Sequence, residues 1–380
     1  MKTLKRILAA TTLLVTLGFA SEANAQVPLE NFFKNPEKAG YQISPDGKYF
    51  SYMAPYENRL NLFVQEVGSD KATRITSETV RDLAGSMWAN GHRILYIKDT
   101  AGDENFQLYG VNVDGTDSKA YTAFPKVRTT IIDPLENIDS LVIIGLNKRN
   151  PQVFDPYRLN LNNGELTQLA ENPGNIQGWM TDHNGKLRVA LAIVDGVNTQ
   201  ILYRETEEQP FRPVLTTNFK ETVSFATFTP DNKMVYALTN IGRDKTALVL
   251  MDPATCEEKE VLYTNDKYDI SGLGYSELKK KLISVSCTGH KGTIRHYFDK
   301  NEEAIRTKLE QKLEGYDINT TSEDKSENIR IIYAGGDRTY GTYYTYNVKE
   351  DKLTKIADLA PWIKEEDMVP MHPITYTCLL

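Results

Sequence analysis

A long-period repeat of polar and apolar segments runs through most of the chain. Seven times, a short polar segment is followed by an almost continuous apolar run and then by further apolar runs. The polar segments begin at residues 44, 88, 133, 181, 229, 276 and 322, which lie 44 to 48 residues apart. A propeller blade of four strands repeats over about 40 to 50 residues. The period therefore predicts seven blades.

The apolar runs of each repeat are typical of β-strands. In the first repeat we expect an inner strand at residues 49–53, a middle strand at 62–67 and an outer strand at 73–76. The first run of each repeat is nearly all apolar, as in a strand buried on both faces, whereas the second tends to alternate. The polar segments, such as SPDGK at 44–48, consist of turn-forming residues. We therefore expect a turn before the inner strand of every blade.

These features predict an all-β fold: a seven-bladed β-propeller of four-stranded antiparallel blades over residues 41–357. A β-sandwich does not need so regular a long period, and a β-solenoid repeats over about 20 to 30 residues, which is too short. Sheets arranged radially bury one another's faces and protect their edges. Residues 26–40 are expected to form an N-terminal arm with a short helix, which either caps the propeller or docks another domain.

The first 25 residues are typical of a signal peptide. Three cations precede an apolar run at residues 7–20 that is too short to span a bilayer comfortably, and Ala23-Asn24-Ala25 supplies the small residues that a signal peptidase reads. We expect cleavage after Ala25 and an exported chain, periplasmic or secreted. No other apolar stretch is long enough to insert, so no membrane association is expected after cleavage.

Composition and charge narrow the classes of partner. Hydrophobic residues make up 40% of the chain and charged residues 25%, as in ordinary globular proteins, and the 21 Tyr and 13 Phe suit pleated sheets. Loss of residues 1–25 removes three cations and one anion, which changes the net charge from −7 to −9. An acidic chain without a basic stripe repels phosphate backbones, so nucleic acid is not an expected partner.

The three cysteines, Cys256, Cys287 and Cys378, are an odd number for an oxidising compartment. Cys256 and Cys287 fall in consecutive repeats, so they could form a disulfide. Cys256 follows a strand, however, and Cys287 lies within one, and a disulfide requires their Cα atoms to be close. Two free thiols are the alternative.

Three groups of segments have features beyond those of the repeat: FFKNPEKA at 32–39 with ISPDGKY at 43–49, Trp88 with DTAGDEN at 99–105, and LAPW at 359–362 with PITYT at 373–377. In this order they resemble secreted bacterial peptidases of the prolyl oligopeptidase family, in the acylaminoacyl-peptidase or dipeptidyl-peptidase-like branch. The resemblance implies a propeller that lies over a C-terminal α/β-hydrolase domain and restricts which substrates reach it. Residues 358–380 then correspond to a truncated linker toward that missing domain.

No residue of the chain is assigned as catalytic. The hydrolase domain of such an enzyme carries a Gly-x-Ser-x-Gly elbow followed by Asp and His, and the chain contains no such pentapeptide. The nearest string, GYSEL at 274–278, lacks the last glycine, and Ser276 occupies the turn position that Ser44 and Thr229 occupy in other repeats. The five histidines are scattered without the spacing of a triad.

Metal and cofactor sites are not expected. His290 and His296 have no evident third ligand nearby, and the oxygen-rich segment 99–105 lacks the spacing of a calcium loop. We interpret this segment as a loop in which Asp103 or Asn105 caps backbone amides. An alternative is that Asp103 and Glu104 face the propeller channel and bind the α-amino group of a peptide substrate.

The resemblance thus implies the substrate-gating propeller of an exported serine peptidase, truncated before the catalytic domain and expected to be inactive alone. Its expected partners are peptide substrates in the propeller channel and a missing or separately encoded α/β-hydrolase domain. A stand-alone periplasmic propeller that binds a protein or peptide as a scaffold is the competing hypothesis.

Overall fold

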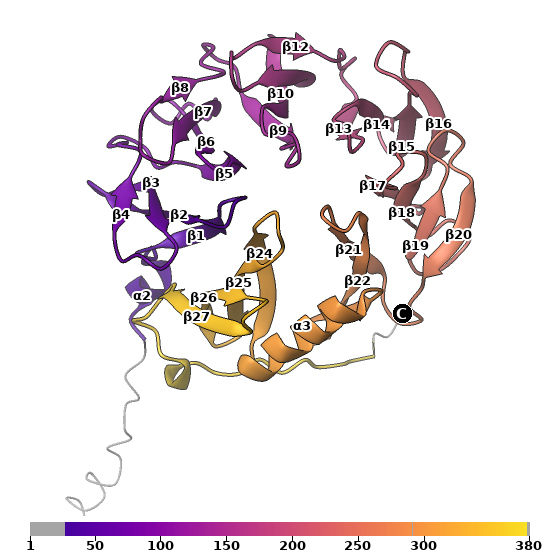
Figure 1. Ribbon diagram of the computed structural model, residues 1–380. Helices are drawn as coiled ribbons and strands as arrows, with labels where there is room; N and C mark the ends of the chain where they lie inside the picture. The colour runs from indigo at the N-terminus through magenta and orange to yellow at the C-terminus, as the bar shows by residue number, and fades with distance from the viewer. Residues whose placement is uncertain (1–26, 291, 378–380) are drawn as a thin grey trace, which may run out of the picture.

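A computed structural model describes residues 27–290 and 292–377. This part of the chain forms a ring of seven antiparallel sheets, numbered here one to seven in chain order (Figure 1). The predicted seven-bladed propeller is therefore confirmed. The strands of sheets one to four are β1 (Ala39–Ile43), β2 (Tyr49–Tyr56), β3 (Arg59–Glu66), β4 (Ala72–Arg74); β5 (Gly85–Asn90), β6 (Arg93–Lys98), β7 (Gln107–Asn112), β8 (Lys119–Ala120); β9 (Thr129–Asp133), β10 (Leu141–Asn150), β11 (Val153–Asn160), β12 (Leu166–Gln168); β13 (Ile176–Thr181), β14 (Leu187–Val194), β15 (Asn198–Tyr203) and β16 (Arg212–Thr217).

The strands of sheets five to seven are β17 (Val223–Phe228), β18 (Val235–Thr239), β19 (Ala247–Met251), β20 (Glu258–Tyr263); β21 (Ile270–Ser276), β22 (Lys281–Gly289), β23 (Gly292–Tyr297); β24 (Asp317–Glu323), β25 (Ile329–Gly336), β26 (Thr339–Asn347) and β27 (Lys352–Asp358). Within each sheet, strands that follow one another in the chain are hydrogen-bonded neighbours. A helix, α2 (Leu29–Phe33), precedes the first sheet, and a short 3-10 helix, η1 (Glu365–Asp367), follows the last.

Sheet six departs from the four-stranded pattern. It has three strands, and a helix, α3 (Lys300–Lys312), follows the third. The helix begins here because Asp299 caps it: the side chain accepts hydrogen bonds from the backbone N–H groups of Asn301 and Glu302. The acidic residues of its first turn also stabilise the helix, because their negative charges interact favourably with the positive end of the helix dipole.

The innermost strand of each sheet was missed by the sequence prediction. Residues 49–53 were expected to form the inner strand of the first sheet, but they belong to β2, and β1 lies nearer the axis of the ring (Figure 1). The innermost strands carry no continuous apolar run because part of their surface stays open near the axis. In β5, for example, no residue is fully buried. The expected polar segments therefore include the ends of the innermost strands, such as Trp88 in β5 and Ser276 in β21.

The polar segments do contain the hairpin turns that follow the innermost strands. At the first, the Ser44 hydroxyl donates to Asp46 Oδ1 at 2.7 Å and accepts from the backbone N–H of Tyr49 at 2.9 Å. Gly47, at φ +73°, supplies the left-handed backbone that the turn requires. The Thr229 hydroxyl makes the equivalent bond to Asp231 Oδ1 at 2.7 Å. The turn chemistry predicted from the repeat is therefore present.

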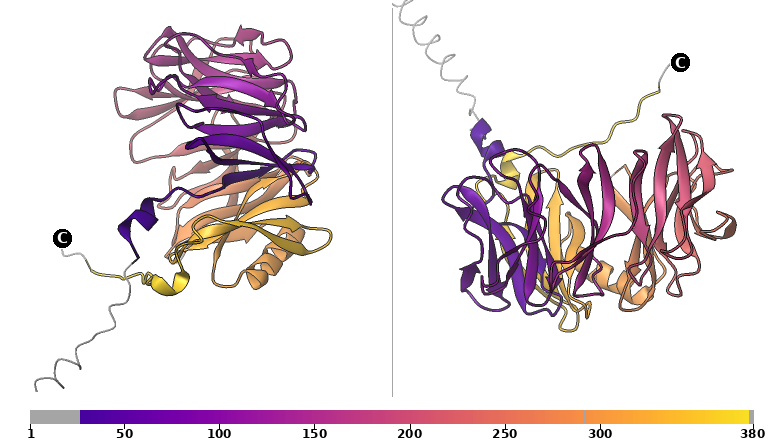
Figure 2. Two further views of the ribbon diagram at one scale, coloured as in Figure 1. Left: turned by 90° about the vertical axis from the view of Figure 1, so that its left-hand side faces the viewer. Right: turned by 90° about the horizontal axis from the view of Figure 1, so that it is seen from above.

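The alternating strand direction gives the ring two different faces. All hairpin turns between the innermost and second strands lie on one face, which we call the turn face. Loops that join one sheet to the next lie on the opposite face, which we call the terminal face. Helix α2 and the segment after β27 also lie on the terminal face (Figure 2). Both ends of the described chain thus leave the ring on the same side.

Apolar clusters fill five of the seven junctions between neighbouring sheets. Between sheets four and five, for example, Val189 and Tyr203 pack with Val235 and Val249, all of them buried. The second strands supply much of this core because both of their faces meet other sheets. Burial of this apolar surface is the main favourable contribution to the stability of the ring.

Sheets seven and one close the ring without sharing a strand. The ring centroid of Tyr41 lies 4.9 Å from that of Tyr52 and 5.4 Å from that of Tyr343, and Ile331 is fully buried in the same cluster. Two polar contacts support this junction: the backbone N–H of Ile43 donates to Ser322 Oγ at 3.1 Å, and that of Lys325 donates to the carbonyl of Pro45 at 2.9 Å. The first and last sheets are thus held together by side-chain packing.

Other sequence predictions have different outcomes. The signal peptide at residues 1–25 and Cys378 lie outside the described residues. Cys256 and Cys287 are free thiols in separate apolar clusters, so the structure contains no disulfide between them. Burial raises the pKa of the Cys256 thiol to about 11, which keeps it protonated and unreactive.

Within residues 27–290 and 292–377, no helix has the length and apolar character needed to cross a membrane.

The substitution Ile331→Ala tests the closure of the ring. We expect it to lower the free energy of unfolding by about 2–5 kcal/mol, because it opens a cavity in the cluster that joins sheets seven and one. The midpoint of urea denaturation at unchanged slope measures this loss. The control Val261→Ala removes methyl groups from a half-exposed strand and should change stability by about 0.5 kcal/mol at most. If both substitutions lowered the free energy of unfolding equally, the contact between sheets seven and one would not be a major source of stability.

Candidate functional site

A polar cavity of about 270 Å³ opens on the turn face, where residues of four sheets meet. Its lining comes from the ends and turns of the innermost strands of sheets three, four, five and six. Four carboxylates and one histidine line it: Asp133, Glu136, Asp182, Glu277 and His183. Among the described residues, no group of three or more His, Cys, Asp or Glu side chains is placed to hold a metal ion.

Residues 134–140, between β9 and β10, extend toward the axis of the ring on the turn face; we call them the bridging loop (Figure 1). Asn137 Nδ2 donates to Glu277 of sheet six at 3.0 Å, and Asp139 Oδ1 lies 2.7 Å from Lys325 Nζ of sheet seven. These two sheets are the farthest from sheet three around a ring of seven. The bridging loop therefore obstructs the axis on this face.

Local interactions give the bridging loop its shape. Asp133 Oδ1 accepts a hydrogen bond from the backbone N–H of Leu135 at 2.8 Å. Leu135 has a φ of +51°, an uncommon conformation for a leucine, and its side chain is buried. A Cβ on Gly185 of the neighbouring turn would lie 3.1 Å from Leu135, so this glycine leaves the space that the leucine needs. The loop is anchored at Leu135 and reaches across the ring from there.

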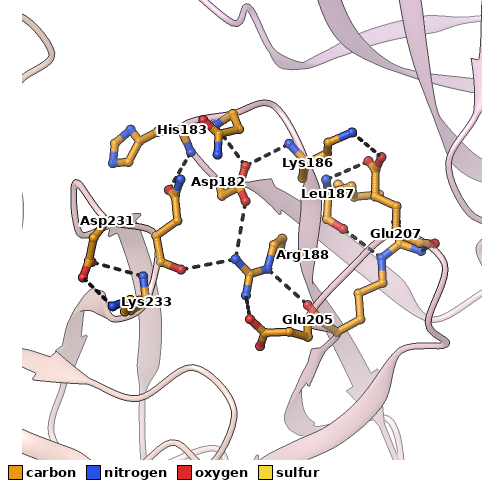
Figure 3. Close-up of polar contacts among 12 residues, drawn as sticks. Asp182, His183, Lys186, Leu187, Arg188, Glu205, Glu207, Asp231 and Lys233 are labelled. Carbon is orange, nitrogen blue, oxygen red and sulfur yellow. Dashed lines mark hydrogen bonds and ion pairs between the residues drawn. The ribbon is translucent and has the colours of Figure 1, made fainter.

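The turn of sheet four, which carries His183, is held by a buried charged network (Figure 3). Arg188 Nη1 lies 3.4 Å from Asp182 Oδ2 and donates to the carbonyl of Asn232 in sheet five at 3.2 Å. Arg188 Nη2 pairs with Glu205 at 3.0 Å. Asp182 Oδ1 also accepts two backbone N–H bonds within its own turn. These interactions fix the position of His183 at the cavity.

His183 links the turns of sheets four, five and six. Its Nδ1 lies 3.4 Å from Glu277 Oε1, and its Nε2 lies 2.9 Å from the carbonyl oxygen of Phe228. Both neighbours are acceptors, so the doubly protonated imidazolium satisfies them best. The hydrogen bond to Glu277 is the main reason that the pKa of His183 is raised, and the same contact lowers the pKa of Glu277. Burial, together with the carboxylates of Glu277 and Asp133, raises the pKa of Glu136.

The described residues do not place a serine beside this histidine. Both ring nitrogens of His183 face a carbonyl or a carboxylate. The Ser276 hydroxyl donates to Glu327 and accepts from the backbone N–H of Lys279 at 2.9 Å, as expected for a turn residue. A serine nucleophile needs a histidine within hydrogen-bond reach. The described residues of the turn-face cavity therefore contain no Ser–His pair.

The terminal face brings together the N-terminal arm and the segment after β27. Trp362 Nε1 donates to the carbonyl of Asn31 at 2.9 Å, and Lys34 Nζ lies 4.1 Å from the centre of the Trp362 ring. The hydroxyl of Tyr340 donates to the carbonyl of Phe32 at 2.7 Å. Two of the segments that carry the resemblance to the prolyl oligopeptidase family, at 32–39 and 359–362, thus meet although they lie at opposite ends of the sequence.

Exposed large apolar side chains gather on the terminal face. They come from α2, from loops on that face and from the segment after β27, and several, such as Phe33 and Phe219, are more than three-quarters exposed. The residues are Leu29, Phe33, Val80, Val197, Phe219, Tyr340, Val369, Met371, Ile374 and Tyr376. Fewer residues of this kind lie elsewhere on the described surface, among them Val67 and Leu278 on the turn face. The two faces therefore differ in chemistry as well as in topology.

Asp103 and Glu104 lie in the hairpin between β6 and β7, on the terminal face, and both are exposed. Asp103 Oδ1 accepts from the backbone N–H groups of Thr100 and Asn105 at 3.2 and 3.1 Å, which confirms the predicted capping role. These hydrogen bonds, above all the one from the Asn105 side chain, lower the pKa of Asp103. The hairpin joins the second and third strands, outside the innermost β5. A role of the two residues in substrate binding stays a prediction.

Sequence reasoning did not single out the residues that close the turn face. Asn137 and Lys325 lie in predicted turns and Asp139 lies two residues after one, and none of the three was assigned a function. The signal available was the length of the third turn, where residues 134–140 separate β9 and β10, whereas residues 44–48 separate β1 and β2. A long charged turn at the centre of a propeller can reach the opposite sheets.

Comparison with known proteins identifies relatives that match almost the whole chain. Dipeptidyl aminopeptidase BIII of Pseudoxanthomonas mexicana is 28% identical over 354 residues, which are 90% of this chain and 50% of that protein. Dipeptidyl peptidase family member 6 of Caenorhabditis elegans is 26% identical over 355 residues, 87% of this chain and 47% of that protein. No protein-family model matches the chain.

A solved structure from a study of two prolyl endopeptidases shares the fold. It superposes with a TM-score of 0.59 at 12% identity, over 92% of this chain and 55% of the solved one. The chain thus shares its fold with this structure and is similar in sequence to two dipeptidyl peptidases. More particularly, the matched dipeptidyl peptidases confirm the resemblance to the prolyl oligopeptidase family. The chain spans about half the length of the curated relatives it matches.

The substitution His183→Gln tests the pairing of His183 with Glu277. The pKa of His183 is raised in the folded chain, so its contribution to stability is complete below its unfolded pKa of about 6.5 and is lost as the pH rises through the higher folded value. Glu277 is more than one-third exposed, so we expect less than about 1 kcal/mol from the pair. The urea midpoint of the native chain should therefore fall between about pH 6 and pH 8 more than that of the variant.

The control for this measurement is His92→Gln, which replaces an exposed histidine. This variant should keep the pH dependence of the native chain. If His183→Gln and the native chain lose stability in parallel over the same pH range, the imidazolium is not paired as the structure indicates.

Proposed function

We propose that this chain is the propeller portion of an exported serine peptidase of the prolyl oligopeptidase family, and that it restricts which peptides reach a catalytic α/β-hydrolase domain. The 380 residues contain no Gly-x-Ser-x-Gly sequence, so the catalytic domain is not among them. The apolar terminal face is the observation that carries this proposal. The relatives support it, because the two dipeptidyl peptidases match this chain over about half of their own length.

The terminal face has the character of an interface. Contiguous exposed apolar surface on a soluble protein usually marks a binding site for another protein or domain. Here the apolar side chains accompany both ends of the described chain, and the Trp362 contact with Asn31 ties those ends together. A domain joined to the chain beyond Thr377 would meet this face first. We therefore place the catalytic domain there.

The turn face, opposite the terminal face, restricts the passage of peptides along the axis of the ring. The bridging loop extends toward the axis of the ring and is held by the pairs Asp139–Lys325 and Asn137–Glu277, of which Asp139 and Lys325 are both more than one-third exposed. An exposed ion pair contributes only about 0 to 1 kcal/mol, so the loop obstructs a peptide without sealing the ring permanently. Asp103 and Glu104, on the terminal face, add negative charge that attracts the α-amino group of a peptide.

The first experiment asks whether the chain has hydrolytic activity of its own. We expect the purified 380-residue chain to react with no fluorophosphonate probe and to release no product from dipeptide p-nitroanilides. Without a nucleophile, base and oxyanion site, nothing in the described chain supplies the rate enhancement of about 10⁶-fold or more that enzymes provide. Dipeptidyl aminopeptidase BIII serves as the positive control. Stoichiometric labelling of the chain would overturn the proposal.

The second experiment tests the terminal face. We expect the chain to self-associate through its exposed apolar residues, and Phe219→Ser combined with Val80→Ser to reduce this association, as measured by sedimentation velocity. The matched control, Leu278→Ser combined with Val67→Ser, changes exposed apolar residues of the turn face and should leave association unchanged. A stable monomer that neither pair affects would instead favour the stand-alone scaffold.

Export is tested separately. The proposal expects the mature chain in the periplasm or culture medium to begin at Gln26, which N-terminal sequencing of the secreted material would show. A cytoplasmic chain that retains Met1 would contradict export and leave the proposal for the terminal face unaffected.

A further inference from the structure

The junction between sheets six and seven holds a polar cleft of about 340 Å³. Five other junctions of the ring are filled by apolar clusters, so this junction is unusual. Sheet six, α3 and sheet seven supply the walls. Its charged lining residues are Arg295, Arg306, Arg330 and Glu302, and its uncharged polar lining includes Ser284, Ser286, Tyr297 and Asn319.

The strand register of sheet six explains why the junction is hollow. Gly272, Ser286 and Arg295 pair across its three strands, and Gly274, Ser284 and Tyr297 form the next row on the same face. A Cβ on Gly272 would lie only 2.8 Å from Ser286 Oγ, and one on Gly274 only 2.7 Å from Ser284 Oγ. The hydroxyls thus occupy the space above the glycines. The face of sheet six that meets sheet seven is therefore polar, and it is recessed at the two glycines.

Helix α3 contributes to the cleft without filling it. Leu309 of α3 packs with Ile318, Ile332 and Tyr346 of sheet seven, all of them buried. The apolar side of the helix is thus directed to sheet seven. The polar face of sheet six remains without an apolar partner among the described residues.

Two of the three arginines of the cleft are neutralised by carboxylates. Arg330 makes a two-pronged contact with Glu302 at 2.8 and 3.0 Å. Arg306 pairs with Glu310 at 2.7 Å and also donates to a backbone carbonyl. These guanidinium groups have the counter-charges that buried cations require.

Arg295 differs from the other two arginines. Its one side-chain hydrogen bond among the described residues goes to the neutral Asn319 Oδ1, at 3.1 Å, and none of their carboxylates forms an ion pair with it. Burial, and next the charge of Arg306, lower the pKa of Arg295, whereas the charges of Tyr297, Glu310 and Asp317 act in the opposite direction. A guanidinium stays charged in proteins, so Arg295 is a partly buried cation that has no carboxylate of the described residues in direct ion-pair contact.

Three hydroxyl groups share the cleft with this cation. Among the described residues, the hydroxyls of Ser284, Ser286 and Tyr297 have no hydrogen-bond partner, although all three residues line the cleft. Each can donate a hydrogen bond to an oxygen atom. One unpaired positive charge and several free hydroxyl donors form a site that is complementary to an oxyanion.

We propose that the cleft between sheets six and seven binds the carboxylate of a small molecule or of a peptide end, with Arg295 as its counter-ion. One uncompensated cation matches a monoanion, and the planar guanidinium matches the geometry of a carboxylate. The volume lies in the range of small-ligand pockets, and Leu273, Ile305 and Leu309 provide apolar walls for the rest of the ligand. The proposal does not depend on the peptidase function proposed above.

Calorimetric titration of the 380-residue chain tests this site with acetate, with the dipeptide Ala-Phe and with Ala-Phe amide, which lacks the carboxylate. We expect Ala-Phe and acetate to bind, and Ala-Phe amide to bind at least about tenfold more weakly than Ala-Phe. Binding of the amide as tight as that of the dipeptide would overturn the proposal, as would no binding of either carboxylate. Tighter binding of inorganic phosphate than of acetate would contradict a monoanion site.

The variant Arg295→Gln should weaken Ala-Phe binding at least about tenfold, whereas the control Arg338→Gln, at an exposed position on the terminal face, should leave it unchanged. Thermal unfolding distinguishes a ligand-binding residue from a structural one. Removal of a buried charge without a counter-ion should maintain or raise the Tm, and acetate should raise the Tm of the native chain but not of Arg295→Gln. A marked loss of Tm in this variant, with unchanged binding of Ala-Phe, would overturn the proposal.

A second variant keeps the proposal testable if Arg295→Gln does not fold. Ser284→Ala combined with Ser286→Ala removes two hydroxyls and leaves every described ion pair of the cleft in place. We expect this pair to weaken Ala-Phe binding about tenfold with little change in Tm. Unchanged binding in a folded double variant would show that the hydroxyls do not contact a ligand.

Discussion

The contact between sheets seven and one determines whether the chain forms a ring at all. Each sheet is built from a continuous stretch of chain, so no shared strand joins the two ends. The packing of Tyr41 and Tyr52 against Ile331 and Tyr343 must hold the ring closed, with few polar contacts to help. The terminal face depends on this closure, because it brings the arm of the first sheet beside the segment after the last. Both ends of the described chain are thereby fixed on one side of the ring.

The sequence was sufficient to predict the number of sheets because a regular period is a property of the whole chain. It failed at the innermost strands for a physical reason. A strand such as β5, with no fully buried residue, has no continuous apolar run, and its polar end merges with the turn that follows. The helix α3 was missed as well: its few buried residues give a weak apolar pattern, although Asp299 is a recognisable capping residue. Local chemistry, such as the Ser44 turn, was predicted well because its partners are close in sequence.

Contacts between distant residues could not be predicted in this way. Asp139 and Lys325 lie 186 positions apart, and only the curvature of the ring brings them together. The bridging loop and the polar cleft both depend on such contacts between sheets. The resemblance of short segments to a peptidase family was nevertheless informative, because the segments at 32–39 and 359–362 meet in space.

The buried Arg188 and the partly buried Arg295 differ in how completely their charges are satisfied. Arg188 is surrounded by Asp182, Glu205 and a carbonyl of the next sheet, so its charge is compensated and it fixes one turn against another. A compensated network of this kind specifies structure, since loss of one partner leaves the others unpaired. Arg295 has no carboxylate in direct contact among the described residues and lies near a second arginine, Arg306, although the charges of Glu310 and Asp317 partly offset that repulsion. An uncompensated cation beside free hydroxyls is therefore better explained by binding than by folding.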